Sequence, residues 1–128
     1  MAFIPYNPNP HGKNTGDCTV RAIAKATGHS WEYTYLALAI QGYLDGDMPS
    51  ANAVWGAYLH RLGYSKHIVP DSCPMCYTVD DFAKDYPRGT YILALSHHVV
   101  CVKDGNLYDS WQSQHETVLY YWTKERTD

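Results

Sequence analysis

Through the first two thirds of the chain, apolar residues recur three and four positions apart, which is the spacing of one helix face. Four such stretches follow a residue that can cap a helix N-terminus, namely Asp17, Ser30, Ser50 and Thr78. Gly28 and Gly63 stand where the first and third stretches end, as expected just beyond a helix. The second helix is predicted over 31–41, with a loop over 42–49. The fourth helix is short and ends before Pro87.

The last third of the chain has the pattern of β-strands. Four runs after Gly89 are rich in β-branched and aromatic residues: 90–96, 98–103, 106–111 and 117–122. Asp104 and Gly105 separate two of these runs, which is a strong hairpin signal. Because helices precede the strands and do not alternate with them, the sequence predicts an α+β fold with N-terminal helices packed on a C-terminal antiparallel β-sheet.

Composition and charge narrow the class of protein. The 128 residues, of which 45% are hydrophobic, suit a single domain over 1–128, with 1–13 as an extended, proline-rich arm. A net charge of −3 without a basic run argues against a nucleic-acid partner. No apolar stretch is long enough for a transmembrane helix, so we expect no membrane partner. The N-terminus lacks a signal-peptide pattern, and we expect a cytoplasmic protein.

Four cysteines are the first candidates for chemistry: Cys18, Cys73, Cys76 and Cys101. In a reducing compartment, free thiols, metal ligands or a catalytic thiol are expected more than disulfides. Cys18 opens the first predicted helix, where unpaired N–H groups and the helix dipole favour the thiolate. The alternative is that Cys18 is a small buried residue at a helix start. Cys101 lies between valines in a predicted strand and is expected in the core.

A nucleophilic cysteine needs a base, and the predicted hairpin selects one of the seven histidines. If the Asp-Gly turn has two residues, His98 lies opposite Trp111 and diagonal to Asp109 on one face of the sheet. The carboxylate of Asp109 is then within reach of the imidazole and can hold its tautomer. His97 points to the other face. A three-residue turn would reverse this assignment.

Attack on a carbonyl also requires donors for the oxyanion that develops. The backbone N–H of Cys18 at the helix start is one such donor. Asn14, four residues before Cys18, is the nearest side-chain amide and the candidate for a second donor. The alternative reading of Asn14 is a turn-forming residue in Asn-Thr-Gly.

Two motifs in this order resemble the small papain-like cysteine peptidases. They are Asn14-Thr-Gly-Asp-Cys18-Thr-Val-Arg and His98-Val-Val-Cys-Val-Lys-Asp-Gly-Asn-Leu-Tyr-Asp109. The chain is most similar to compact versions encoded by bacteriophages and bacteria. It has a looser likeness to bacteriocin leader peptidases and to ovarian-tumour-type deubiquitinases. The resemblance implies a helix carrying Cys18 packed on an antiparallel sheet carrying His98 and Asp109, and, for a phage protein, action in the host cytoplasm.

The chain departs from the papain pattern in three respects. The glycine-rich stretch around the nucleophile is missing, Asn14 stands in for the usual upstream glutamine, and Asp109 occupies the place of an asparagine. The first departure leaves the class of substrate open. The second leaves the oxyanion donor open.

The sequence therefore predicts a cysteine peptidase that cleaves an amide or isopeptide bond in a protein or peptide substrate. Cys18 forms the acyl-thioester, His98 transfers the proton and Asp109 orients His98. No metal or organic cofactor is required. A thiol amidase or acyltransferase would use the same triad. The alternative from another class is a non-catalytic interaction protein, in which Cys73 and Cys76 organise a zinc-stabilised loop.

Overall fold

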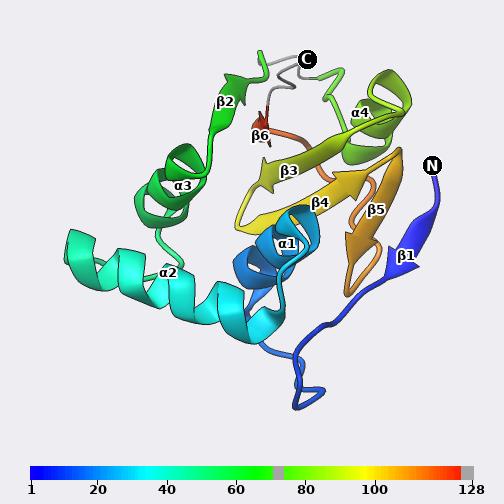
Figure 1. Cartoon of the computed structure of the whole chain (residues 1–128). Helices are drawn as coiled ribbons and strands as arrows, with labels where there is room; N and C mark the ends of the chain where they lie inside the picture. The colour runs from blue at the N-terminus through cyan, green and yellow to red at the C-terminus, as the bar shows by residue number, and fades with distance from the viewer. Residues whose placement is uncertain (71–73, 125–128) are drawn as a thin grey trace.

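The computed structural model describes residues 1–70 and 74–124 (Figure 1). Over these residues the chain has a mixed α+β fold with four helices and one six-stranded sheet, so the α+β part of the predicted fold class is confirmed. The helices are α1 (Cys18–Thr27), α2 (Trp31–Asp45), α3 (Asn52–Arg61) and α4 (Val79–Asp85). The strands are β1 (Phe3–Pro5), β2 (Tyr64–Ile68), β3 (Thr90–Leu95), β4 (His98–Lys103), β5 (Asn106–Asp109) and β6 (Tyr120–Lys124).

Local capping signals set several of the helix boundaries, although the predicted cap Ser50 is wrong, because Ala51 precedes α3 and no side chain caps that helix. The hydroxyl of Ser30 accepts a hydrogen bond from the backbone N–H of Tyr33 at 3.1 Å and so begins α2. Thr78 and Asp81 form a reciprocal capping box at the start of α4. Gly28 ends α1 in the left-handed region, with φ of 75°. These boundaries follow from side chains within four residues of one another, which explains why the sequence predicts them.

The predicted loop over 42–49 is wrong in its first half, because α2 continues to Asp45. Gly46, in the left-handed region, ends the helix instead of Gly42. Gly42 lies inside the helix and is buried. The carbonyl oxygen of Asp47 would stand 2.7 Å from a Cβ at Gly42, so this position requires glycine for a close backbone approach.

The sheet is larger than predicted and is mixed. Its strand order is β1-β5-β4-β3-β6-β2, with β1 parallel to β5 and every other neighbouring pair antiparallel. The two outer strands were not predicted: β1 comes from the N-terminal arm and β2 from the segment after α3. Edge strands have one neighbour and one open side, so they need little apolar alternation of their own. The prediction of a purely C-terminal, antiparallel sheet is therefore corrected.

The hairpin of β4 and β5 has the predicted register. Asp104 and Gly105 both have positive φ, 51° and 76°, as a two-residue hairpin turn requires. Val102 consequently pairs with Leu107. The strand ends at Asp109, two residues earlier than predicted. Side chains keep the predicted alternation up to that point.

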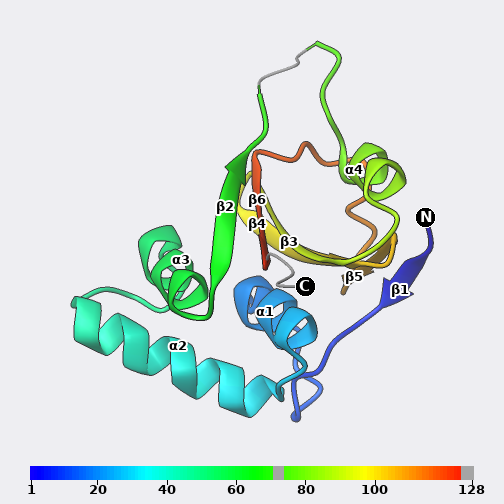
Figure 2. The same ribbon diagram turned by 45° about the horizontal axis from the view of Figure 1, so that its top comes forward.

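Helices cover both faces of the sheet, with α1, α2 and α3 on one side and α4 on the other (Figure 2). Alternate residues of β3 divide between the two resulting cores. Ile92 packs with Ile23 of α1, and Leu93 packs with Phe82 of α4. The α1 helix lies against β4. This packing brings the first residue of α1 to the end of the sheet where β4 begins.

Candidate active site

Cys18 is the first residue of α1 and is half-buried. Asp17 precedes it, but the Asp17 side chain does not cap the helix. Its carboxylate is bound by the guanidinium of Arg21 and accepts a hydrogen bond from the indole N–H of Trp31 at 2.8 Å. The first N–H groups of α1 therefore have no cap from Asp17, and the positive end of the helix dipole lies at the thiol.

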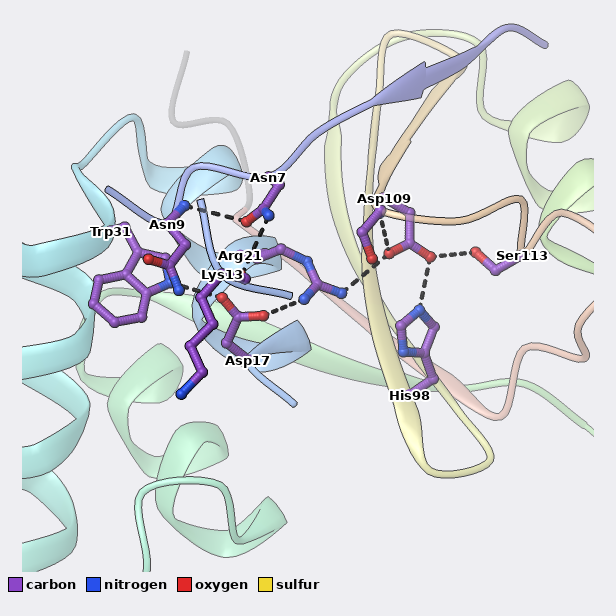
Figure 3. Close-up of polar contacts among 10 residues, drawn as sticks. Asn7, Asn9, Lys13, Asp17, Arg21, Trp31, His98, Asp109 and Ser113 are labelled. Atoms are coloured by element: carbon purple, nitrogen blue, oxygen red, sulfur yellow. Dashed lines mark hydrogen bonds and ion pairs between the residues drawn. The ribbon is translucent and has the colours of Figure 1, made fainter. Parts of the chain in front are cut away.

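His98 stands between Cys18 and Asp109. Its Nε2 lies 2.7 Å from Oδ2 of Asp109 (Figure 3). The Cys18 side chain lines the same cleft as the imidazole and interacts with it electrostatically. The indole ring of Trp111 packs on the imidazole, with ring centroids 4.8 Å apart. The structure thus brings together the three residues that the sequence analysis selected for a triad, in the order thiol, imidazole, carboxylate.

Asp109 is the last residue of β5 and is 2% exposed. Its Oδ2 also accepts a hydrogen bond from the hydroxyl of Ser113 at 2.6 Å, and its Oδ1 accepts one from the backbone N–H of Ser110 at 2.7 Å (Figure 3). The guanidinium of Arg21 lies 3.3 Å from Oδ1. With donors on both oxygens, the carboxylate is held in one orientation toward His98.

The electrostatics of the three groups favour an ion pair between Cys18 and His98. Burial by itself would raise the pKa of the Cys18 thiol, but hydrogen bonds with His98 and with the backbone of Val99 hold that pKa below its usual value. Burial would lower the pKa of His98, yet hydrogen bonds with Asp109 and Cys18 raise it to about 9. For Asp109, burial is again opposed by hydrogen bonds from His98 and Ser113, which lower its pKa. Both shifts favour a thiolate beside an imidazolium over two neutral groups.

Arg21 is a component of the site that the sequence analysis missed. It is 5% exposed, lies one turn after Cys18 on α1, and contacts the carboxylates of both Asp17 and Asp109. The four-residue spacing between Asp17 and Arg21 is a sequence signal for an ion pair on one helix face. No sequence signal indicates the contact with Asp109, which joins α1 to β5.

Cys18 and His98 line a cleft of about 330 Å³ at the end of the sheet. Asn14, the predicted oxyanion donor, is exposed and is not among the described residues that line this cleft. Asn52, at the start of α3, does line it. The side-chain oxygen of Asn52 accepts the indole N–H of Trp55 at 3.0 Å, which leaves its NH₂ group as a donor. Asn52 is therefore a second amide candidate that the sequence analysis missed.

Two of the remaining candidates lie away from the triad contacts. His97 occupies the turn between β3 and β4 with φ of 58°, and it is exposed at the rim of the cleft. Cys101 is fully buried in the core against α1, and burial raises its pKa to about 12, which makes it an inert thiol.

No site among the described residues corresponds to the predicted zinc-stabilised loop. Cys73 lies outside the described residues. Cys76 is disulfide-bonded, which corrects the expectation of free thiols or metal ligands at this position. Across 1–70 and 74–124, His, Cys, Asp and Glu form no group of three or more that could hold a metal ion. Within the same residues, no helix has the length and apolar character needed to cross a membrane.

Comparisons of the chain with protein-family models, with curated proteins and with solved structures find no match.

Proposed function

We propose that the protein is a papain-like cysteine peptidase that hydrolyses an amide or isopeptide bond in a protein or peptide. One observation carries the proposal: a cysteine at a helix N-terminus lines one cleft with a histidine, and a buried carboxylate orients that histidine. This is the arrangement that converts a weakly nucleophilic thiol into a thiolate and keeps a proton ready for the leaving group.

The reaction begins when the Cys18 thiolate attacks the carbonyl carbon and a C–S bond forms. Backbone N–H groups at the start of α1 and an amide side chain, Asn52 or Asn14, stabilise the oxyanion. The His98 imidazolium then gives its proton to the amine as the C–N bond breaks, which leaves an acyl-thioester and a neutral imidazole. Water attacks the thioester, and His98 takes the proton from this water. The carboxylic acid product leaves, and the thiolate–imidazolium pair is restored.

The test is alkylation of the folded protein by iodoacetamide at pH 6, read residue by residue by mass spectrometry. Cys18 is expected to react much faster than Cys101, because its thiolate persists below the ordinary thiol pKa of about 8.5. His98→Ala is expected to remove this selectivity. His97→Asn is the matched control, since it changes the neighbouring imidazole but keeps a residue that tolerates positive φ.

The outcome that would overturn the proposal is equal reactivity of Cys18 in wild type and in His98→Ala. A loss of selectivity in His97→Asn as large as that in His98→Ala would also overturn the assignment of the base. Selectivity that depends on His98 alone supports the proposed nucleophile and justifies digestion of a peptide library as the next step.

A further inference from the structure

A second cavity opens beside the cleft of Cys18, between the N-terminal loop, α1 and α2. Its volume is about 420 Å³, within the range of small-ligand pockets. Gly16, Thr19 and Ser50 line both cavities. We call the second cavity the α2 pocket. Because the two cavities share a wall at the start of α1, a chain bound across Cys18 passes the mouth of the α2 pocket.

The walls of the α2 pocket are mainly apolar and aromatic. Trp31 and Tyr35 line it and stack on each other, with ring centroids 5.1 Å apart and planes 26° apart. Leu38, on the next turn of α2, is buried and also contributes to the lining. The indole N–H of Trp31 is already bound by Asp17 at 2.8 Å, so a ligand meets the ring surface of Trp31. Such walls suit a bulky apolar or aromatic side chain.

Two charged side chains line the α2 pocket, Lys13 and Asp17. The carboxylate of Asp17 is buried and paired with the guanidinium of Arg21, so it presents little free negative charge to a ligand. Lys13 extends from the N-terminal loop on the side of the Trp31 indole (Figure 3) and is exposed. A carboxylate beside the apolar side chain of a ligand would therefore be favoured.

We propose that the α2 pocket is the subsite that selects the substrate, by binding one bulky apolar or aromatic side chain near the scissile bond next to an acidic residue. This inference rests on the proposed peptidase function and adds the class of peptide that is cleaved. The occupant is a segment of a substrate chain, because Gly16, Thr19 and Ser50 line both the pocket and the cleft of the nucleophile.

The experiment is digestion of a peptide library followed by mass spectrometry, which reports residues on both sides of each cleaved bond. Wild type is expected to show a preference for Phe, Leu or Trp at one position near the bond, with Glu or Asp beside it. In Tyr35→Ala, the ratio of kcat/KM for a Phe peptide to that for its Ala counterpart is expected to fall about tenfold. In Lys13→Glu, the preference for an acidic neighbour is expected to disappear.

The matched control is Tyr33→Ala, on α2 but outside the pocket lining, where a 55% exposed tyrosine is removed. It should keep the wild-type profile. Unchanged profiles in Tyr35→Ala and Lys13→Glu would overturn the inference, as would a wild-type profile without the two preferences. Iodoacetamide reactivity of Cys18 is measured in every protein. If Cys18 is not selectively reactive, the peptidase proposal itself fails, which is a different result from a reactive Cys18 without substrate preference.

Discussion

Replacing Arg21 with methionine is expected to destabilise the fold strongly, because the change leaves two buried carboxylates without their shared cation. The side chains of Arg21, Asp17 and Asp109 are 6%, 6% and 1% exposed. Methionine fills much of the same space, so the main loss is electrostatic. Removing one partner of a buried ion pair costs about 3–5 kcal/mol, and this is the expected loss in the free energy of unfolding.

The remaining hydrogen bonds indicate which of the two carboxylates is less stabilised once Arg21 is replaced. Asp109 keeps the hydroxyl of Ser113, the backbone N–H of Ser110 and the imidazole of His98 as partners. Asp17 keeps only the indole N–H of Trp31 among the side-chain hydrogen bonds of the described residues. Asp17→Asn in the Arg21→Met background is therefore expected to recover a large part of the lost stability, since it removes the less compensated charge.

Urea unfolding at pH 7 measures both effects. Lys84→Met is the matched control, because Lys84 and Asp80 form an ion pair with the same four-residue spacing at 3.2 Å, with Lys84 67% exposed. That exposed pair is expected to contribute less than about 1 kcal/mol. The reasoning is refuted if Arg21→Met loses no more stability than Lys84→Met, or if Asp17→Asn in the Arg21→Met background brings no recovery.

Three further predictions follow from the site and the fold. The pKa of Cys18 is lowered, so its contribution to stability is lost as pH falls, whereas that of His98 is raised to about 9, so its contribution is lost as pH rises. Between the unfolded values of about 6.5 for His98 and 8.5 for Cys18 the two slopes have opposite signs. Urea unfolding should therefore show a steeper decline of stability with rising pH in Cys18→Ala, where Asp109 still raises the pKa of His98, than in wild type. Asn52→Ala is expected to slow peptide cleavage about 10²-fold and Asn14→Ala much less; the reverse order in kcat would return the oxyanion role to Asn14. Gly42→Ala is expected to lower stability by about 1–3 kcal/mol despite the helix preference of alanine, because the added Cβ meets a backbone oxygen; a raised melting temperature would contradict this.

Features that depend on neighbouring residues could be predicted from the sequence. The capping residues Ser30 and Thr78 act on N–H groups within one turn, and the Asp-Gly turn sets the register of β4 and β5 over two residues. The contact of His98 with Asp109 belongs to this class, because antiparallel pairing across a short turn places two residues 11 positions apart on one face. Alternation and turn length are sufficient to predict it.

Features that depend on distant segments were decided by the tertiary structure. The edge strands β1 and β2 depend on partners elsewhere in the sheet. The contact of Arg21 with Asp109 spans 88 positions, and Asn52 reaches the cleft only through the placement of α3.

The sequence by itself determined the identity of the candidate nucleophile, its place at a helix start, and the imidazole–carboxylate pair. Only the tertiary structure decided that Cys18 lies beside His98 and that a pocket opens next to them. It also decided that Arg21 contacts both Asp17, which precedes Cys18, and Asp109, which binds His98. The physical reason is that helix caps and strand registers follow from short-range hydrogen bonding, whereas the packing of α1 on β4 depends on the whole buried surface of the fold, which no local period encodes.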